Sequence, residues 1–518
     1  MGYRLGIDVG GTNTDAVIID EKLNLIEKVK TPTTKDVTTG IYSAINKVLE
    51  KSGVDRDAIS FAMLGTTHCT NAIVERKRLC RVGILRMGKP ATMAIAPMVD
   101  WPPELVQAVG EEYFLVSGGH EYDGREITPL NPDEIRAAAA AMKGKVDAVA
   151  VISVFSPINA EHEKRAVDIL REELGDLPFS LSHEIASIGF LERENATILN
   201  AALAEVAKTT ALSFKAGLEQ EGVKNASIYL CQNDGTLMSI DYAMKYPILT
   251  VACGPTNSIR GASFLSGYDN AIVLDVGGTT SDIGVIVNSF PRESSVAVEI
   301  GGVRTNFRMP DIISFGLGGG TIIRESGGEI VIGPESVGYR LTEEALVFGG
   351  NTLTATDIAV RLGMAEIGDP SRVSHIEEGF ARKAVKKMMT MVNEGIDKMK
   401  LSAEPVPLIL VGGGIILIPD EVEGVSEIIR PGNHDVANAL GAAIAQVSGQ
   451  VERVYSLSEI SREEALNMAK AIAVEEAVKA GAEPSTVQIV EVEDVPLAYL
   501  PGNATRVRVK AAGNLRHG

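Results

Sequence analysis

The sequence predicts an α/β fold of two related lobes, with an inserted subdomain and a small C-terminal α/β segment. A chain of 518 residues is long enough for about three domain-sized units. The pattern Asp-Val-Gly-Gly-Thr-x-(Thr/Ser)-Asp occurs twice, at residues 8–15 and 275–282. Each copy lies between two apolar runs of strand length that are rich in β-branched residues. Because the copies are about half a chain apart, they indicate a duplicated lobe rather than a solenoid of short repeats.

Each copy of the repeat is expected to form a strand, a tight turn and a returning strand. Its Gly-Gly-Thr turn permits positive φ and leaves no Cβ above the backbone amides. Consecutive N–H groups can then point at one anion, which suits a phosphate group. The alternative, two ordinary glycine-containing hairpins, is disfavoured by the near identity of the copies. The residues expected to bind phosphate are Gly10, Gly11, Thr12, Asn13 and Thr14 in the first copy and Gly277, Gly278, Thr279 and Thr280 in the second.

Four aspartates belong to the repeat. Asp8 and Asp275 end the first strand of their copies, where a carboxylate can hold Mg²⁺ through water. We expect these two side chains to organise the metal ion and the phosphates, which makes them the first candidates for catalysis. Asp15 and Asp282 follow the turns, and they either cap the turn backbone or hydrate the metal ion.

A third glycine cluster follows another apolar strand. The chain has 52 glycines, a larger share than the usual ~7%. Residues 408–414 are apolar until they end in Gly412, Gly413 and Gly414. A strand that ends in this way is typical of a backbone that passes close to a flat ligand.

A fourth cluster, residues 315–321, contains Gly318 and Gly319 and is expected to form another close-approach loop. No GxxxxGK[ST] sequence occurs in the chain, so the phosphate site is not a P-loop. A Rossmann fingerprint is also absent from the first strand, because Gly10 and Gly11 open a hairpin and not a helix.

Charge and hydropathy exclude several classes of partner. The chain has 49 Lys and Arg against 68 Asp and Glu, a net charge of −19, which disfavours a nucleic-acid binder. The longest apolar run, residues 406–419, falls short of the roughly 20 residues of a membrane helix. Arg4 and Asp8 interrupt the first apolar stretch, which is unlike a signal peptide. We expect a cytoplasmic protein that binds neither nucleic acid nor membranes.

Two Asp-x-Gly-Gly-Thr hairpins and a late Gly-Gly-Gly strand resemble the actin, sugar-kinase and heat-shock-ATPase superfamily. In that superfamily the hairpins are the phosphate loops, and the late glycines contact adenosine. More narrowly, the chain resembles the A-type subunit of the hydantoinase/oxoprolinase family over nearly its whole length. Further motifs that carry this resemblance lie at residues 65–67, 70–72, 75–76, 182–184, 192–197, 232–235, 253–255, 333–336 and 354–357.

The resemblance implies two actin-like ATPase lobes and an enzyme that uses ATP and Mg²⁺. Members of the family open or activate a cyclic amide, such as a hydantoin or 5-oxoproline, and their acetone-carboxylase relatives phosphorylate a carbonyl substrate. ATP would transfer phosphate to a substrate oxygen, and a separate B-type partner subunit would complete the reaction. We also expect an oligomer. Two other functions stay open, a small-molecule kinase and a non-catalytic actin-like nucleotide switch.

His68 and Arg193 are further candidates for catalysis. His68 lies in the sequence Gly-Thr-Thr-His-Cys-Thr-Asn. It is either a hydrogen-bonded histidine after a strand, or a donor or metal ligand near the transferred phosphate. Arg193 lies in a polar stretch before an apolar helix, where it either contacts phosphate or substrate or belongs to a solvated helix start. Asp234 and Asp357 are weaker candidates of the same kind.

Helix and strand signals give a provisional division of the chain. A capping Asn131 followed by proline predicts a helix start, and Ser461 with Glu464 predicts another helix that Gly481 ends. Strands are expected at residues 487–492 and 506–509. The expected units are an N-terminal lobe over 1–185 with an inserted substrate subdomain at about 76–185, a second ATPase lobe over 186–450, and a C-terminal α/β appendage over 451–518.

Overall fold

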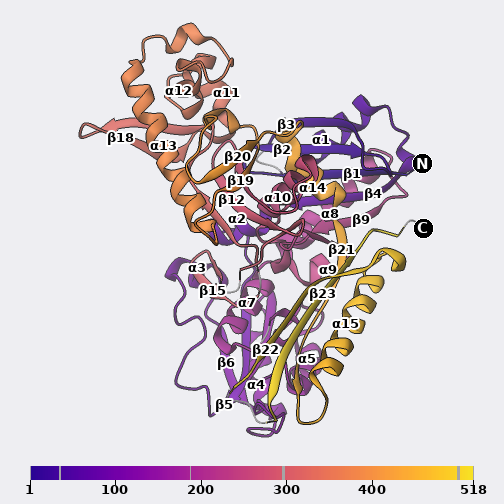
Figure 1. Cartoon of the computed structure of the whole chain (residues 1–518). Coiled ribbons are helices and arrows are strands. Elements are labelled where there is room, and N and C mark those ends of the chain that lie inside the picture. The colour runs from indigo at the N-terminus through magenta and orange to yellow at the C-terminus, as the bar shows by residue number, and fades with distance from the viewer. Residues whose placement is uncertain are drawn as a thin grey trace.

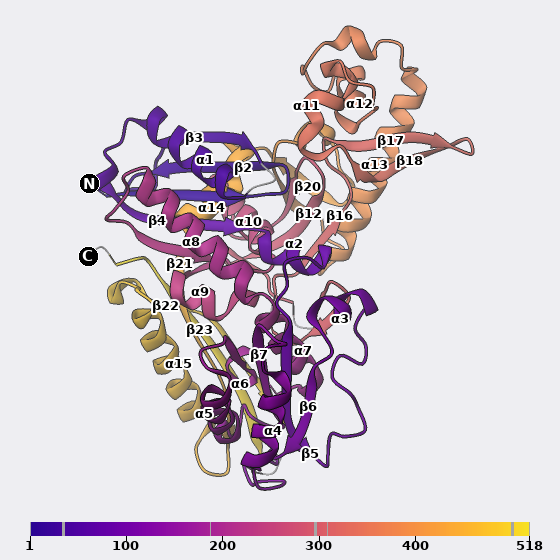
Figure 2. The same ribbon diagram turned by 180° about the vertical axis from the view of Figure 1, so that it is seen from behind.

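Two lobes lie side by side, and a third body lies below them. The computed structural model describes residues 2–33, 37–186, 188–294, 298–307, 309–498 and 502–516. In Figure 1 the N-terminal strands lie at upper right, and an orange segment of the second lobe projects at upper left. The lower body places the purple inserted segment beside the yellow C-terminal strands and helix, and Figure 2 shows the same arrangement from behind.

A nine-stranded sheet forms the first lobe and extends into the lower body. Its strand order is β22-β23-β21-β10-β9-β4-β1-β2-β3. β1 and β2 pair antiparallel as the predicted hairpin, and β4 and β9 continue the sheet in parallel. The strands are β1 (Tyr3–Val9), β2 (Asn13–Ile19), β3 (Leu25–Pro32), β4 (Ile59–Thr66), β9 (Ser227–Cys231), β10 (Thr236–Ser239), β21 (Gln446–Ser456), β22 (Gln488–Pro496) and β23 (Ala504–Gly513).

The second lobe contains a smaller sheet with a matching hairpin. Its strand order is β13-β12-β11-β19-β20, and β16 also pairs with β12. In β1–β2 Asp8 lies opposite Asp15, and in β11–β12 Asp275 lies opposite Asp282, so the two hairpins have the same register. The sequence repeat is therefore a structural repeat. The strands are β11 (Ala271–Val276), β12 (Ser281–Val287), β13 (Phe290–Pro291), β16 (Ile312–Phe315), β19 (Val406–Val411) and β20 (Val425–Ile429).

Two closely packed helices, α10 (Cys253–Ser266) and α14 (Ala437–Ile444), join the sheets. α14 packs on β1 and β2, and α10 packs on β12. A Cβ on Gly261 would lie 1.9 Å from the carbonyl oxygen of Ala437, and one on Gly441 would lie 1.9 Å from that of Asn257. Only glycine permits this approach, so the two glycines fix the distance between the helices that connect the lobes.

The inserted segment has a parallel sheet of its own, in the order β6-β5-β7-β8. α4 and α5 cover one face of this sheet, and α3 and α7 cover the other. The predicted start of α4 is confirmed, because the Asn131 side chain accepts hydrogen bonds from the amides of Asp133 and Glu134. The elements are β5 (Val82–Lys89), β6 (Tyr113–Ser117), β7 (Ala148–Ser153), β8 (Phe179–Leu181), α3 (Pro103–Val109), α4 (Pro132–Met142), α5 (Glu161–Leu174), α6 (Ser182–Ile185) and α7 (Phe190–Ala202).

The C-terminal strands extend the first sheet and do not form a separate one. β21 pairs with β10 in parallel and with β23 antiparallel. α15 (Arg462–Lys479) packs on β21 and β23, and its predicted capping box, Ser461 with Glu464, is present. The strands β9 and β10, which the sequence placed in the second lobe, also belong to this sheet. The sheet thus crosses the limits expected at residues 185 and 450, because strand pairing joins segments that are far apart in the chain.

The remaining elements surround the two large sheets. No helix in the described ranges is both long enough and apolar enough to cross a bilayer. The helices are α1 (Val37–Ser52), α2 (His68–Glu75), α8 (Ala204–Gln220), α9 (Ile240–Lys245), α11 (Leu341–Glu344), α12 (Ala355–Arg361) and α13 (Glu378–Met399), and the short hairpins are β14 (Val298–Ile300) with β15 (Val303–Thr305) and β17 (Thr321–Ser326) with β18 (Glu329–Ser336).

Candidate functional site

The turns of the two matched hairpins face each other. Each turn is closed by the same hydrogen bond, from Gly10 N to Asn13 O at 3.0 Å and from Gly277 N to Thr280 O at 2.9 Å. The hydroxyl oxygens of Thr12 and Thr279 are 3.2 Å apart. Two segments from opposite halves of the chain therefore meet at one place, as the repeat predicts.

A cavity of about 350 Å³ lies at this meeting point. Its walls come from both hairpins, from the start of α10 and from the glycine turn after β19. Of the residues expected to bind phosphate or nucleotide, those that line the cavity are Gly10, Gly11, Thr12, Asn13, Gly277, Gly278, Thr279, Thr280, Gly319, Gly412, Gly413 and Gly414.

Two expected nucleotide-binding residues, Thr14 and Gly318, do not line the cavity. Thr14 is fully buried in β2, and its hydroxyl lies 3.4 Å from that of Thr33. A Cβ on Gly318 would lie 2.6 Å from backbone atoms of Gly278 and Thr279. The close approach expected for the loop at residues 315–321 therefore exists at Gly318, but its partner is the second hairpin and not a ligand.

The two leading aspartates are held by the central helices. Asp8 accepts hydrogen bonds from the side-chain amides of Asn257, on α10, and Asn438, on α14, at 3.2 and 3.0 Å. The Ser258 hydroxyl, also on α10, donates to Asp275. Burial raises the pKa of Asp8 to about 6 despite these amides, and it also raises the pKa of Asp275. Each carboxylate would therefore gain from a cation in the cavity.

The two trailing aspartates occupy matched positions with different partners. On β3, opposite Asp15, lies Lys30, whose ammonium is 2.7 Å from a carboxylate oxygen. On β16, opposite Asp282, lies Ser314, whose hydroxyl donates to the carboxylate. Removal of water by the surrounding protein raises the pKa of Asp282 to about 7. The backbone is duplicated, but only the first hairpin has a lysine to neutralise its trailing aspartate.

Replacing Asp282 by Asn is expected to raise the melting temperature more at pH 8 than at pH 5. Burial keeps the pKa of Asp282 near 7 in the folded chain, against 3.8 for a free side chain. The folded state thus binds more protons between these values, so this group lowers the free energy of unfolding as pH rises from about 4 to 7. Asparagine has no such titration. Calorimetry at both pH values checks this, with the exposed Asp168→Asn as control; an equal shift at both would contradict it.

The glycine turn after β19 borders the cavity at close range. A Cβ on Gly412 would lie 2.4 Å from a carboxylate oxygen of Asp275, and one on Gly414 would lie 2.7 Å from the carbonyl oxygen of Gly277. Gly413 has no atom within 4 Å of its would-be Cβ. Gly412 and Gly414 therefore let this turn pack against the second hairpin, and Gly413 leaves space that a ligand can fill.

An apolar wall completes the cavity on the side of the second lobe. Phe348, Ile367 and Ile416 line it, together with Leu341. Apolar side chains around a narrow space suit a flat ring, whereas the backbone amides of the hairpin turns suit phosphate groups. This wall could not be predicted from the sequence, because its residues lie in separate short segments with no shared pattern.

Lys30, Asn257 and Asn438 were also missed. Lys30 could have been found from the sequence, because the strand after the predicted hairpin would pair with the second strand of that hairpin. This pairing places Lys30 opposite Asp15. No sequence pattern predicts the two asparagines, since they lie on helices α10 and α14, which only the tertiary fold brings together.

His68 does not line this cavity. It begins α2 with 5% of its surface exposed, and its Nδ1 lies within hydrogen-bonding distance of the Thr66 hydroxyl. Burial lowers the pKa of the ring to about 4, so the imidazole is neutral near pH 7. Of the two alternatives for His68, its burial and its contact with Thr66 favour the hydrogen-bonded histidine after a strand.

Arg193 is also outside this cavity and is fully buried in α7. Its guanidinium donates to the carbonyl oxygens of Ser153 and Ile188, at 2.8 and 3.0 Å, and to the Ser182 hydroxyl at 3.0 Å. Neither a phosphate contact nor a solvated helix start describes this position. Of the weaker candidates, Asp357 belongs to the capping box of α12.

The carboxylates present fit a magnesium ion that is bound mainly by water and phosphate. In the part of the chain that the structure describes, no group of three or more His, Cys, Asp or Glu residues could hold a metal ion. Mg²⁺ needs fewer protein ligands, since it usually binds one or two carboxylates together with waters and phosphate oxygens. Asp8 and Asp275 line the same cavity and supply two carboxylates.

Comparison with known proteins gives matches to two family models and to curated relatives. The hydantoinase/oxoprolinase N-terminal region model matches residues 4–174, and the hydantoinase/oxoprolinase model matches residues 193–367. The acetophenone carboxylase gamma subunit of Aromatoleum aromaticum is 28% identical over 69% of this chain and 53% of its own length. The caprolactamase subunit alpha of Pseudomonas jessenii is 28% identical over 70% of this chain and 54% of its own length. The chain thus spans about half the length of these relatives.

A solved structure shows the same fold. The crystal structure of the ATP-dependent caprolactamase from Pseudomonas jessenii superposes with a TM-score of 0.78 at 21% identity, over 99% of this chain and 88% of that chain. The predicted fold class, two actin-like ATPase lobes with an insertion and a C-terminal α/β segment, is confirmed.

Proposed function

The chain belongs to the hydantoinase/oxoprolinase family, and we propose that it is an ATP-dependent enzyme subunit that activates a small cyclic amide. It would transfer the γ-phosphoryl group of ATP to the carbonyl oxygen of the amide. One observation carries the proposal: two matched glycine turns, each beside an aspartate, face each other across one cavity. A hydantoin-like or 5-oxoproline-like ring is the substrate class that the family supports best, and a separate partner subunit would complete the reaction.

The residues of the cavity suit phosphoryl transfer. Amide resonance makes the carbonyl carbon a poor electrophile, and a phosphorylated oxygen makes it reactive because phosphate is a good leaving group. Such a transfer depends mainly on alignment and on neutralisation of charge. The hairpin amides would orient the phosphates, and Asp8 and Asp275 would hold Mg²⁺ through water. The ion would supply positive charge against the phosphate oxygens.

A carboxylase-type reaction is the second candidate. The acetophenone carboxylase subunit is as similar to this chain as the caprolactamase subunit is, at 28% identity each. Both reactions would begin with phosphoryl transfer to a carbonyl oxygen, so the cavity described above serves either one. They differ in the substrate, a ketone or an amide, and in the step that the partner subunit performs.

Labelled substrate tests the proposal directly. The purified chain would receive ATP, Mg²⁺ and a hydantoin whose carbonyl oxygen is ¹⁸O, and ADP release and the phosphate produced would be analysed by mass spectrometry. We expect faster ADP release and ¹⁸O in the phosphate. ADP release that no cyclic amide or ketone accelerates, or phosphate without the label, would reject the proposal. A stable phosphorylated product without ring opening in the presence of a partner would indicate a kinase.

Replacing Gly413 by Val is expected to weaken ATP binding about tenfold or more, which corresponds to ~1.4 kcal/mol for each factor of ten. A Cβ at this position has no protein atom within 4 Å, so the new side chain would begin in the open space beside the glycine turn. Competition of ATP against a fluorescent nucleotide measures the affinity. Gly432→Val is the matched control, because Gly432 also has no atom within 4 Å of its would-be Cβ but does not line the cavity. Equal affinities of the two variants would contradict the nucleotide site.

A further inference from the structure

The cavity between the hairpin turns is lined by several acidic side chains. Among the residues that the structure describes, Lys30 is the only lysine or arginine that lines it. A triphosphate adds more negative charge, and its oxygens need positive partners where water is excluded. Mg²⁺ supplies part of that charge, and Lys30 is the candidate for the protein's own share. The aspartates that line the cavity are Asp8, Asp15, Asp275, Asp282 and Asp435.

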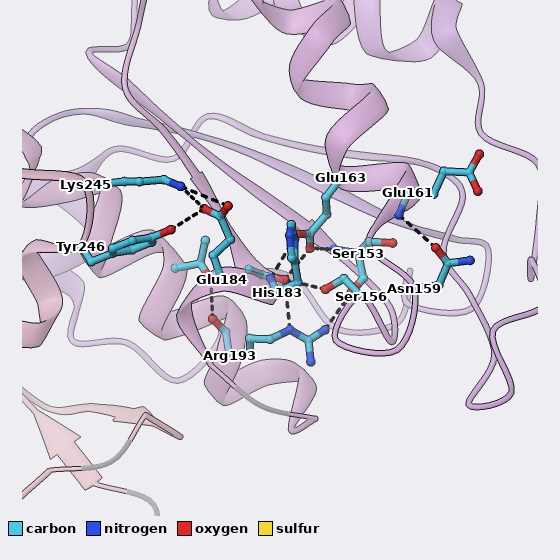
Figure 3. A network of polar contacts seen from close by, with 12 residues as sticks. Ser153, Ser156, Asn159, Glu161, Glu163, His183, Glu184, Arg193, Lys245 and Tyr246 are labelled. Carbon is cyan, nitrogen blue, oxygen red and sulfur yellow. Dashed lines mark hydrogen bonds and ion pairs between the residues drawn. The ribbon is translucent and has the colours of Figure 1, made fainter. Parts of the chain in front are cut away.

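Other buried cations of the fold are used elsewhere. Arg193 donates to the Ser182 hydroxyl and to two backbone carbonyls in the lower body, and Figure 3 shows its guanidinium within that network. Arg260, on α10, donates to the carbonyl oxygen of Ser289 at 2.6 Å and lies over the ring of Phe290. Neither arginine lines the cavity. The lysine on β3 is therefore the group to consider for a contact with phosphate.

Strand pairing places Lys30 in one row with two aspartates of the first hairpin. Asp8 on β1 lies opposite Asp15 on β2, and Asp15 lies opposite Lys30 on β3. Residues directly opposite each other in antiparallel strands project from the same face of the sheet. Helix α14 packs on β1 and β2, and its Asn438 donates to Asp8 and lines the cavity. Lys30 thus reaches the cavity although it lies outside the repeated motif.

Asp15 holds the Lys30 ammonium in place. The Lys30 Nζ atom lies 2.7 and 2.8 Å from the two oxygens of the Asp15 carboxylate. Only 3% of the Asp15 side chain is exposed, against 33% of the Lys30 side chain. An ammonium group has three N–H donors, so the lysine can keep this contact and still donate to a ligand in the cavity. Asp15 is therefore a positioning residue for Lys30.

The charge of Lys30 also acts on the second hairpin. Burial raises the pKa of Asp275, and the Ser258 hydroxyl and the positive charge of Lys30 oppose that rise. The ammonium is thus within electrostatic reach of both hairpins. On the second hairpin the strand position opposite Asp282 holds Ser314 and not a lysine. One ammonium therefore serves the space between the two turns.

We propose that Lys30 binds the phosphate groups of the nucleotide and that Asp15 orients it for this contact. The Lys30 ammonium donates to a phosphate oxygen and neutralises charge that Mg²⁺ leaves uncompensated. This role explains why the first hairpin pairs its trailing aspartate with a lysine. That the ligand is a nucleotide rests on the function proposed above, whereas transfer of phosphate to an amide is not required.

Competition of a non-hydrolysable ATP analogue against a fluorescent nucleotide, with Mg²⁺ and without any amide, tests this role. We expect Lys30→Met to bind the analogue about tenfold or more weakly, because one charged hydrogen bond is lost. Lys28→Met is the matched control. Lys28 lies on the same strand, is 35% exposed and pairs with Asp435 at 2.7 Å, but it does not line the cavity. Unchanged affinity in Lys30→Met, or equal losses in both variants, would overturn the proposal.

A double variant separates phosphate binding from a purely structural role. Lys30→Met leaves the buried Asp15 carboxylate unpaired, which by itself destabilises the first hairpin. Adding Asp15→Asn removes that charge, so the melting temperature without nucleotide should return toward the wild-type value while affinity for the analogue stays low. Recovery of wild-type affinity in the double variant would overturn the proposal. If Lys30→Met binds weakly as expected but no cyclic amide accelerates ADP release, the phosphoryl-transfer proposal fails and the assignment of Lys30 stands.

Discussion

Asp8→Asn and Asp275→Asn are each expected to lower ATP turnover by ~100-fold or more, equivalent to about 2.7 kcal/mol of transition-state stabilisation. Both carboxylates line the cavity between the hairpin turns, and both have a raised pKa because of burial. An amide has the same shape but no negative charge, so it cannot hold the hydrated cation that the triphosphate needs. Steady-state ADP release at saturating ATP and Mg²⁺ measures the loss.

The fold should survive both substitutions. Asn257, Asn438 and Ser258 are the hydrogen-bond donors around the two aspartates, and an asparagine oxygen can still accept from one of them at each site. Removal of a buried charge also offsets part of any lost hydrogen bond. Asp168→Asn, on the exposed face of α5, is the matched control and should keep full turnover. Near-normal turnover in either active-site variant would refute the assignment of that aspartate.

The two hairpins could be predicted because their geometry depends on residues that are neighbours in the sequence. A Gly-Gly-Thr turn between two strands specifies its own geometry, and the matched bonds at Gly10 and Gly277 show that both copies adopt it. That the copies meet was implied by the repeat and by the family resemblance. The contact itself, between Thr12 and Thr279, depends on the crossing of α10 and α14, which no local pattern specifies.

The remaining differences arise from contacts between distant segments. β21 pairs with β10 across more than two hundred residues, so the sequence alone suggested a separate C-terminal unit. His68 and Arg193 have the right chemistry for a phosphate site, but both are buried and neither lines the cavity between the hairpin turns. Arg193 instead donates to Ser182, which donates to Glu163, a residue in the first turn of α5 for which the sequence gave no functional signal.

Breaking the buried ion pair between Arg86 and Glu194 should destabilise the lower body. Arg86, on β5, is fully buried, and Glu194, on α7, is 1% exposed. Two hydrogen bonds join them, at 2.7 and 2.5 Å, and Arg86 also donates to the carbonyl of Ile95 at 2.6 Å. The arginine lowers the pKa of Glu194 while burial raises it more, so the charge of the glutamate depends on this partner.

Arg86→Met is therefore expected to cost ~3–5 kcal/mol, because it leaves a buried carboxylate unpaired. For a unit of 150–250 residues this corresponds to roughly 10 °C in melting temperature. The loss should be larger at pH 8 than at pH 5, since protonation of Glu194 at low pH removes the unpaired charge. Differential scanning calorimetry at both pH values measures the effect.

The double variant Arg86→Met with Glu194→Leu distinguishes the unpaired charge from lost packing. Removing both charges should restore most of the stability, because two apolar side chains of similar volume can replace a buried ion pair at little cost. If the double variant is as unstable as Arg86→Met alone, then the loss of stability comes from altered packing around β5 and not from the charge of Glu194. A single variant within 1 °C of the wild type would show that the pair contributes little.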